Sequence, residues 1–374
     1  MLVLPAGAAT NFYGKNAIVW NALTFTAIAY TGLSNLANVC LRPIPILNKA
    51  LPTVTPLPFH VVSSKVAVIT GSNTGIGFET SRALVERGFE VVMACRSRDK
   101  AMKAIEAIES QNPNAPGKAV FVAPLDLSSI DSINAFSTVM NDKYDKIDVL
   151  INNAGRNYGD STKEGFDEVF FTNYLGHFLL TQNLMDNLLK ADKPRVVNLS
   201  SVMHHFCGNT DTHSAEYWRG FALSGKKEQS SYSPSKLAAL FFTIELNRRY
   251  RSKGLRSIAV NPGAVNSDIW RNKPRYLVPL FKLLYLTNTQ GCHTSVAAAV
   301  SEDLPDNAFY LQPYHQVRPS VAPFPPLEML GVFVGHLVTR PRLPNDGTDG
   351  QLSSQVLWET SEKLLEQTVG LKSN

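Results

Sequence analysis

Acidic residues are missing from the start of this chain. No Asp or Glu precedes Glu79, whereas Lys15, Arg42, Lys49 and Lys65 all lie in that stretch. The 374 residues together carry a formal net charge of only +5, and they contain no long basic block. A basic excess this small and this dispersed argues against nucleic acid as a partner. The N-terminal stretch therefore differs chemically from the rest of the chain.

Cysteine is also scarce, with four residues that lie far apart and form no CxxC pair. This spacing excludes a disulfide scaffold and the paired ligands of a structural zinc site, so we expect no metal and a reducing compartment for the folded domain. Hydrophobic residues make up 44% of the chain and charged residues 18%. That balance is ordinary for a protein that buries a core, and it excludes wholesale disorder.

The N-terminal stretch contains an uncharged segment, residues 17–41. A membrane-spanning helix needs about 20 apolar residues, but Asn and Thr residues within this segment weaken the signal. Three interpretations stay open: a membrane anchor with the following domain in the cytoplasm, an organellar targeting segment, and an apolar helix packed on the domain. Prolines between Pro43 and Pro58 then indicate a stiff linker.

Beyond the linker, short β-branched runs alternate with longer segments of helical apolar spacing. The expected strands are Val66–Thr70, Glu90–Cys95, Ala119–Pro124, Ile147–Asn152, Arg195–Leu199 and Leu255–Asn261. The expected helices are Ile76–Arg87, Asp99–Glu109, Ser129–Lys143, Gly165–Leu189 and Ser233–Lys253. Buried parallel strands have this composition, and a βαβα repeat requires right-handed crossovers. The pattern predicts an α/β fold in which one catalytic domain contains a Rossmann-type doubly wound parallel sheet.

The alternation also predicts how the chain is divided. Residues 1–63 are expected to be an N-terminal apolar segment with its Pro-rich linker, and residues 64–303 the Rossmann-type domain. Residues 304–374 are expected to complete the sheet, to form a Pro-rich loop over about 313–347, and to end in a helix around Ser353–Gln367.

A glycine-rich turn directly follows the first expected strand. Glycines let the backbone approach a pyrophosphate closely, and the helix N-terminus that follows offers amide donors and a favourable dipole. The GxxxGxG spacing alone also fits a tight strand-to-helix turn. In its strand-turn-helix context it predicts a dinucleotide site formed by Gly71, Ser72, Asn73, Thr74, Gly75, Ile76 and Gly77.

The end of the second expected strand bears on which dinucleotide is bound. NAD-dependent Rossmann proteins commonly place an acidic residue there for the ribose 2′-hydroxyl, and this chain has Arg96 instead. A guanidinium pairs well with a 2′-phosphate, so Arg96 predicts NADP(H), with a solvated loop arginine as the alternative. Asp126 has two open roles, binding the adenine amino group or capping the helix that begins near Ser129.

Tyr232 and Lys236 are four residues apart on one expected helix and therefore lie on one helical face. A phenol with a pKa of about 10 is a poor base near neutrality, and a nearby ammonium favours the phenolate. We therefore expect Lys236 to lower the pKa of Tyr232 toward the working pH. The YxxxK spacing is common by chance, and it becomes specific only together with other motifs.

Those other motifs are present, and the chain resembles the short-chain dehydrogenase/reductase family over roughly Ser64 to Asp303. Four motifs occur in that family's order: Thr70–Gly77, Asn152-Asn153-Ala154-Gly155, Ser200-Ser201 and Tyr232–Lys236. Two further segments are similar to the retinol dehydrogenase-type branch: Val197–Ser201 followed by His204-His205, and Lys236–Ala239 leading to Glu245-Leu246. The two histidines have no carboxylate or cysteine at a spacing that would coordinate a metal. We interpret them as ordinary polar residues near the pocket mouth.

The resemblance implies a role for each matching residue. Tyr232 would be the general acid/base for the substrate oxygen, and Ser201, rather than Ser200, would donate a hydrogen bond to that oxygen. Lys236 would lower the Tyr232 pKa and bind the nicotinamide ribose, while Asn173 would hold a water in a proton relay to Lys236. The other implied cofactor contacts are Asn152, Asn153, Ala154, Pro262, Gly263, Val265 and Ser267, of which Asn153 fits a structural tie between strands equally well.

The function implied is that of an NADP(H)-dependent oxidoreductase acting on an alcohol or carbonyl of a lipophilic substrate such as a retinoid or steroid. Many NADP-dependent relatives carry a basic residue in the glycine-rich turn, and neither Asn73 nor Thr74 supplies one. The alternatives are a protochlorophyllide-type reductase and a non-catalytic dinucleotide-binding interaction protein. The physiological substrate, the reaction direction and a homo-oligomeric state stay open.

Overall fold

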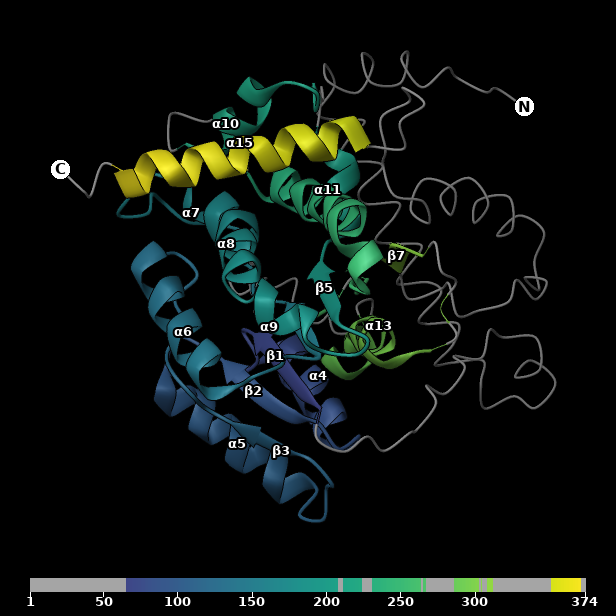
Figure 1. Ribbon diagram of the computed structural model, residues 1–374. Helices are drawn as coiled ribbons and strands as arrows, with labels where there is room; N and C mark the ends of the chain where they lie inside the picture. The colour runs from purple at the N-terminus through teal and green to yellow at the C-terminus, as the bar shows by residue number, and fades with distance from the viewer. Residues whose placement is uncertain are drawn as a thin grey trace, which may run out of the picture.

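The structure is a computed structural model that describes residues 65–207, 211–223, 231–263, 265–266, 286–302, 304, 308–311 and 351–370. Within them, seven parallel strands form one sheet in the order β3-β2-β1-β4-β5-β6-β7 (Figure 1). The strands are β1 Val66–Thr70, β2 Glu90–Ala94, β3 Lys118–Val120, β4 Val149–Asn152, β5 Arg195–Leu199, β6 Arg256–Val260 and β7 Tyr310–Leu311. The predicted doubly wound, Rossmann-type sheet is confirmed.

Helices cover both faces of this sheet (Figure 1). One face packs on α4 (Gly75–Val85), α5 (Arg98–Gln111) and α13 (Asn288–Val300). The other packs on α6 (Ile130–Lys143), α8 (Gly176–Asn183) and α11 (Tyr232–Tyr250). Successive strand residues point to opposite faces, so the β1 residue Val68 joins one apolar cluster while Ala67 and Ile69 join the other. Burial on both faces explains why the strands read as nearly continuous apolar runs.

The order of the strands reverses between β1 and β4. The chain continues from β1 outward to β2 and β3 on one side, and from β4 outward to β5, β6 and β7 on the other. In open α/β sheets, ligands bind at the carboxyl ends of the strands at such a reversal. Here those ends are Thr70 of β1 and Asn152 of β4, so the glycine-rich turn and the Asn-Asn-Ala-Gly segment meet at the reversal.

Two of the expected helices begin at serine caps. The hydroxyl of Ser97 accepts a hydrogen bond from the Lys100 amide at the start of α5, and Ser129 accepts one from the Ser132 amide at the start of α6. Side-chain oxygens that accept from first-turn amides stabilise helix starts. Because Ser129 is the cap of α6, the proposed capping role of Asp126 is wrong.

The expected helix Gly165–Leu189 is interrupted. It consists of α7 (Glu168–Phe170), a π-helical turn η1 (Phe171–Leu175), α8 and α9 (Met185–Leu189). The start moves to Glu168 because Gly165 has a φ of 84° in the preceding turn, and the Asp167 carboxylate accepts from the Phe170 amide at 2.7 Å. π turns are often found at functional sites, and η1 contains Asn173.

No bounds were predicted from the sequence for three elements. They are α10 (Ala215–Ala222), α13 and the short strand β7, and the last completes the sheet where residues 304–374 were expected to do so. Small and polar residues blur the apolar period of α13. Its capping box, in which Thr287 and Gln290 exchange hydrogen bonds, is the sequence signal that could have located it.

The expected C-terminal helix is present as α15 (Gln351–Gly370), and it lies along α11 as an outer layer (Figure 1, yellow). Trp358 of α15 is 1% exposed. Its ring centroid lies 5.0 Å from that of Phe178 and 5.9 Å from that of Phe242, and the guanidinium of Arg249 sits 4.2 Å from it. The helix therefore seals aromatic side chains of α8 and α11 from water.

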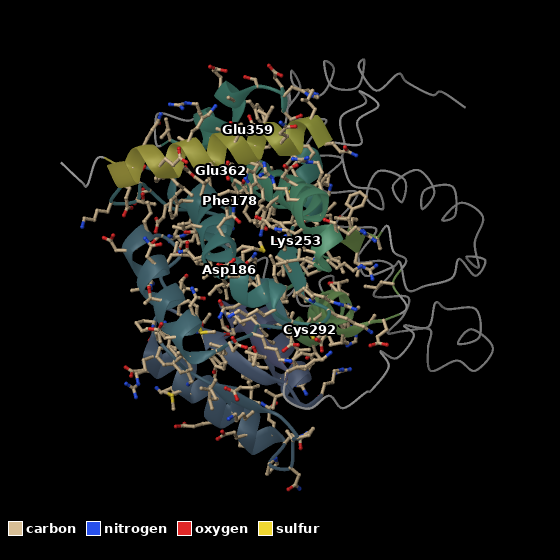
Figure 2. All side chains as sticks on the ribbon, viewed as in Figure 1. Phe178, Asp186, Lys253, Cys292, Glu359 and Glu362 are labelled. Carbon is tan, nitrogen blue, oxygen red and sulfur yellow. The ribbon has the colours of Figure 1, made fainter. Side chains whose placement is uncertain are left out.

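A buried carboxylate also joins α15 to α11. The Glu245 side chain is inaccessible to solvent and accepts hydrogen bonds from Arg248, from Arg249 and, at 3.1 Å, from the Ser354 hydroxyl of α15. Figure 2 shows Phe178 beneath this helix and Glu359 and Glu362 along it. Burial raises the pKa of Glu245, but the hydrogen bonds and charges of the two arginines outweigh it and hold the pKa below its usual range.

None of the helices in the described ranges is long and apolar enough to cross a membrane. The predicted anchor at residues 17–41 and the predicted Pro-rich loop at 313–347 lie outside those ranges. The divisions at residues 63/64 and 303/304 stay predictions.

Candidate functional site

The glycine-rich turn is packed too closely for larger residues. Gly71 has a φ of 62°, and its amide donates to the Ala94 carbonyl at 2.9 Å. A Cβ added to Gly71 would lie 3.0 Å from Ala154, and one added to Gly77 would overlap the Gly71 carbonyl oxygen. The turn therefore presents bare backbone at the reversal of the strand order, as close approach to a pyrophosphate requires.

The N-terminus of α4 opens from this turn. Thr74 is its extended N-cap with a φ of −156°, and the first turn of the helix contains no acidic residue. The positive end of the helix dipole thus faces the turn without a carboxylate of that first turn to neutralise it. Ser72 is fully buried, with its hydroxyl 3.2 Å from the Cys95 sulfur, so only its backbone is left for a cofactor.

Arg96 and Asp126 approach each other after the second and third strands. An Arg96 nitrogen lies 3.5 Å from the Asp126 carboxylate, and the Arg96 side chain is 74% exposed. The other Asp126 oxygen accepts from the amide and the hydroxyl of Ser128, at 3.0 and 2.6 Å. Burial raises the pKa of Asp126, but these hydrogen bonds and the charge of Arg96 outweigh it and hold the pKa below its usual range. A carboxylate thus faces Arg96, whose guanidinium stays mostly in solvent.

The side-chain amides of Asn152 and Asn153 both donate hydrogen bonds to other residues of the protein. Asn152 is 3% exposed and donates to Asn198 at 2.8 Å and to Thr181 at 3.1 Å. The Asn153 amide side chain donates to the Thr70 carbonyl at 2.7 Å. The geometry of Asn153 is that of a tie between strands, and contacts from this segment to a cofactor would come from its backbone and from Ala154.

The two adjacent serines after β5 have different surroundings. Ser200 is 2% exposed, and its hydroxyl donates to the Lys236 carbonyl at 2.8 Å. Ser201 is partly exposed, caps the short 3₁₀ helix η2 (Val202–Phe206), and hydrogen-bonds the Tyr232 hydroxyl. Only Ser201 is therefore placed to share a substrate oxygen with Tyr232.

Lys236 lies directly behind the tyrosine. It is 4% exposed, its Nζ donates to the Leu199 carbonyl at 2.9 Å, and the same atom lies 5.7 Å from the Tyr232 ring centroid. Burial disfavours the charged ammonium and lowers the pKa of Lys236 to about 8.

The pKa of Tyr232 differs from the expectation. Burial raises it to about 12, and the hydrogen bond from Ser201 acts in the opposite direction without prevailing. In this arrangement burial is the larger effect, and the Lys236 ammonium is directed at the Leu199 carbonyl. The lowering that a charged Lys236 would give to the Tyr232 pKa stays a prediction. At neutral pH Tyr232 keeps its proton, which suits a proton donor.

Asn173 is held by its whole side chain. Its Oδ1 accepts from the Arg156 amide at 2.8 Å, while its Nδ2 donates to the Arg156 carbonyl at 2.8 Å and to the Ser235 hydroxyl at 3.0 Å. A Cβ on Gly155 would lie 3.4 Å from Asn173 Oδ1 and 3.5 Å from Lys236 Nζ. Asn173 and Lys236 thus flank the same point, where the expected relay would run.

The segment after β6 is only partly described. Gly263 has a φ of 84°, and its amide donates to the Asn261 side chain at 3.0 Å, so Pro262-Gly263 forms a turn at the carboxyl end of the sheet. Val265 is 3% exposed and packs so closely on α13 that a Cβ on Gly291 would collide with it. Ser267 lies outside the described residues.

Two histidines differ from what the motifs suggested. His204 is fully buried with its Nδ1 2.5 Å from the Ser201 carbonyl, so its expected place at the pocket mouth is wrong. His177 belongs to no motif, yet its imidazole contacts both Thr70 and Asn173. No group of His, Cys, Asp or Glu side chains among the described residues is arranged to hold a metal ion.

Comparison with known proteins gives one family. Residues 65–211 match the family model described as short chain dehydrogenase. Mouse retinol dehydrogenase 12 is 41% identical over 252 residues, which cover 65% of this chain and 75% of the relative. Human retinol dehydrogenase 13 is 34% identical over 255 residues, which cover 66% of this chain and 75% of the relative.

Solved structures agree in fold. A putative uncharacterized protein from Mycobacterium paratuberculosis aligns with a TM-score of 0.53 at 28% identity, over 84% of this chain and 97% of that one. Salutaridine reductase from Papaver somniferum aligns with a TM-score of 0.51 at 22% identity, over 66% of this chain and 98% of that one.

Proposed function

Because the chain belongs to the short-chain dehydrogenase/reductase family, in its retinol dehydrogenase-type branch, we propose that it interconverts an alcohol and a carbonyl on a lipophilic substrate with NADP(H). One observation carries the proposal. Tyr232 is hydrogen-bonded to Ser201 with Lys236 behind its ring, and the group lies after β5, on the same edge of the sheet as the glycine-rich turn.

The turn fits a nicotinamide dinucleotide. The family's oxidoreductases use this cofactor, and the bare backbone at Gly71 and Gly77 with the N-terminus of α4 suits its pyrophosphate. Nicotinamide, when bound, supplies or accepts a hydride. The residues of the chain would bind and orient the cofactor, and Lys236, as the resemblance implies, would contact the nicotinamide ribose.

Tyr232 performs the proton transfer in the proposed mechanism. Its high pKa keeps the phenol protonated at neutral pH, so it can donate to a carbonyl oxygen that gains negative charge during reduction. Ser201 donates a second hydrogen bond to that oxygen, which strengthens as the charge grows. A charged Lys236 then stabilises the phenolate left behind, and the proton is restored through the relay at Asn173. Oxidation reverses these transfers.

Arg96 supports NADP(H) over NAD(H). Its largely exposed guanidinium stands after β2, where an acidic residue would bind the 2′-hydroxyl of NAD. A 2′-phosphate would replace Asp126 as the partner of Arg96 or join it, through charge-assisted hydrogen bonds.

The substrate proposed is a retinoid-like alcohol or aldehyde, which the names of the relatives support. We also propose that residues 17–41 attach the chain to a membrane, where such a substrate partitions. The domain that follows would face the cytoplasm, because two basic residues, Arg42 and Lys49, follow the segment and only Lys15 precedes it.

A turnover screen tests the proposed function. Purified full-length protein is supplied with NADPH or NADH and a panel of all-trans-retinal, a ketosteroid, a long-chain aldehyde and protochlorophyllide, and cofactor oxidation is followed by absorbance. We expect turnover of retinal with NADPH. Binding of both cofactors without turnover of any substrate would instead favour a non-catalytic dinucleotide-binding protein.

A further inference from the structure

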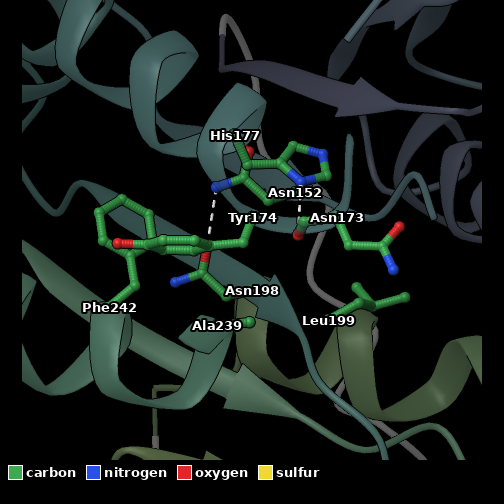
Figure 3. A pocket seen from close by; sticks show the side chains of 8 residues that line it. All are labelled: Asn152, Asn173, Tyr174, His177, Asn198, Leu199, Ala239 and Phe242. Atoms are coloured by element: carbon green, nitrogen blue, oxygen red, sulfur yellow. Dashed lines mark hydrogen bonds between the residues drawn. The ribbon is translucent and has the colours of Figure 1, made fainter. Parts of the chain in front are cut away.

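His177 connects the glycine-rich turn with the relay asparagine. It is 3% exposed and lies in the first turn of α8, directly after η1. Its Nε2 lies 2.9 Å from the Thr70 hydroxyl at the end of β1. Its Nδ1 lies 3.2 Å from the Asn173 carbonyl, and Figure 3 shows this second contact. A single imidazole thus connects the end of β1, where the glycine-rich turn begins, with the π turn η1.

The two contacts define where the imidazole proton resides. A carbonyl oxygen only accepts hydrogen bonds, so Nδ1 must carry the proton that is shared with Asn173. Nε2 then accepts from the Thr70 hydroxyl. Burial lowers the pKa of His177 to about 3, the hydrogen bond to Asn173 opposes this, and the positive charge of Lys236 adds to the lowering. The ring is neutral and keeps one donor and one acceptor in fixed directions.

The Thr70 hydroxyl is saturated at the other end of this bridge. It accepts from the amides of Asn153 and Ala154, each at 2.9 Å. Its single proton faces His177 Nε2 at 2.9 Å, whereas the Ile151 carbonyl is farther away at 3.4 Å. A hydroxyl offers one donor and two acceptor sites, so every site is in use. The imidazole therefore supports the segment that lies against the glycine-rich turn.

His177 also borders a small polar cavity of about 10 Å³ between β4, β5, α8 and α11 (Figure 3). Asn152 and Asn173 are among the residues that line it, and the Oδ1 of Asn152 has no hydrogen-bond partner in the described part of the chain. A polar space of this size is close to the minimum for one water molecule. Shrinking the imidazole would enlarge this space and let water compete for the Asn173 carbonyl.

We propose that His177 is a positioning residue for the reaction, and that its Nδ1–H fixes the Asn173 carbonyl of the π turn beside the Lys236 relay. The inference rests on the proposed function. The side chain of Asn173 is already bound to Arg156 and Ser235, so its carbonyl is the part of the residue that His177 controls. Loss of this contact should slow proton delivery without weakening substrate binding.

Three substitutions separate the two contacts of the ring. In His177→Asn the amide nitrogen can take the place of Nδ1 and still donate to Asn173, but the contact with Thr70 is lost. In His177→Gln the amide oxygen can take the place of Nε2 and still accept from Thr70, but the contact with Asn173 is lost. His177→Phe keeps the ring volume and loses both. His293→Asn, a partly buried histidine of α13 outside the proposed machinery, is the matched control.

The readouts are kcat, KM, cofactor Kd and the solvent deuterium isotope effect on kcat. We expect kcat to fall at least about tenfold in His177→Gln and His177→Phe but to stay within about threefold in His177→Asn, with KM and cofactor Kd within about threefold throughout. The isotope effect should rise in the two slow variants, because the proton step becomes more limiting. The control should match the wild type in every readout.

Equal losses in His177→Asn and His177→Gln, or a loss confined to KM, would overturn the proposal, because both indicate general support of the fold. Thermal unfolding of each variant identifies a loss that merely follows stability. A wild-type protein without turnover would refute the proposed function. In that case the ¹⁵N spectrum of the His177 imidazole still shows whether the ring forms the two hydrogen bonds to Thr70 and Asn173. A protonated Nδ1 with an unprotonated Nε2 is expected, and the opposite tautomer would overturn it.

Discussion

Burial decides the protonation states of the candidate catalytic residues. It raises the pKa of Tyr232 to about 12 and lowers that of Lys236 to about 8, so both shifts disfavour charge near the substrate oxygen. A tyrosine in this state is prepared to donate a proton, and a lysine in this state carries its charge only up to mildly alkaline pH. Near neutrality these states suit the proton donation from Tyr232 that the proposed reaction needs in the direction of carbonyl reduction.

The lowered pKa of Lys236 predicts a pH dependence. The charged form is lost as the pH rises through about 8, and with it the stabilisation of the Tyr232 phenolate. We expect kcat/KM for carbonyl reduction to be level below that pH and to fall above it, by up to about tenfold per unit. The titratable neighbours are Tyr232 and the neutral His177, which keep their states over this range.

A pH series of kcat/KM with NADPH and retinal measures the predicted fall above pH 8. Lys236→Arg keeps its charge, so any remaining activity should lose the fall near pH 8. A wild-type profile that stays flat well above pH 9 would contradict the assignment, as would an unchanged fall in Lys236→Arg.

Arg96 carries the prediction on cofactor choice. If its guanidinium binds the 2′-phosphate, Arg96→Ala should weaken NADPH binding by roughly ten- to a hundredfold, the equivalent of about 1.5–3 kcal/mol for a charged hydrogen bond. NADH binding should change much less. Fluorescence titration of both cofactors measures the Kd values, and equal losses would show that Arg96 supports the loop instead.

Motif residues could be located from the sequence because their chemistry and order are distinctive, as for Ser201, Tyr232 and Lys236. The contacts around these residues could not be predicted from the sequence. Asn152 was expected beside the cofactor, yet its amide donates into the core. His177 was missed because the contacts that matter join residues 107 positions apart in the chain, at Thr70, and a pattern of neighbouring residues does not contain them.

At the scale of elements, α15 packs along α11, the helix that carries the candidate catalytic residues. α11 carries Tyr232 and Lys236 at one end and the buried Glu245 farther along. α15 covers its outer face with Trp358 and ties it through Ser354. The packing of α15 should therefore contribute to the rigidity of α11.

Trp358→Ala tests this packing. Truncating a fully buried Trp side chain removes its aromatic contacts and leaves a cavity, so the free energy of unfolding should fall by about 3–5 kcal/mol. Glu359→Ala on the same helix is the control, because Glu359 is exposed and its side chain accepts a hydrogen bond from Gln355 on the helix surface. Its free energy of unfolding should change by less than about 0.5 kcal/mol. Urea unfolding followed by circular dichroism measures both, and a similar small loss in the two variants would show that α15 is not part of the stable core.

Elements with strong periodicity or β-branched runs were predicted well, and β1 and β5 have the expected bounds. Boundaries shifted where a local contact decides them. The third strand ends at Val120 rather than Pro124 because β3 pairs with β2 only as far as Val92. The interruption at η1 depends on tertiary hydrogen bonds of Asn173, so no local pattern marks it.

For the molecule as a whole, the doubly wound sheet brings residues of distant segments to one edge. Thr70, Asn152, Ser201 and Tyr232 come from four parts of the chain and meet at the carboxyl ends of β1, β4 and β5. The alternation of strands and helices was sufficient to predict this convergence. The attachment of the domain to a membrane is a separate proposal, based on residues 17–41.

Fractionation tests that proposal. Full-length protein should remain in the pellet when membranes are extracted with alkaline carbonate, whereas a chain that begins at about Val61 should be released, because about 20 apolar residues suffice to anchor a protein. A soluble full-length chain would contradict the anchor. Soluble protein that lacks residues 1 to about 50 would identify a cleaved targeting segment instead.

The most direct test of the central claim is turnover by Tyr232→Phe, which keeps the aromatic ring and removes only the hydroxyl. With NADPH and a carbonyl substrate accepted by the wild type, we expect kcat to fall by at least about 10²–10⁴-fold, as for other losses of general acid/base catalysis, while the cofactor Kd is retained. Turnover near the wild-type rate in a correctly folded Tyr232→Phe protein would contradict the assignment of Tyr232 as the proton donor.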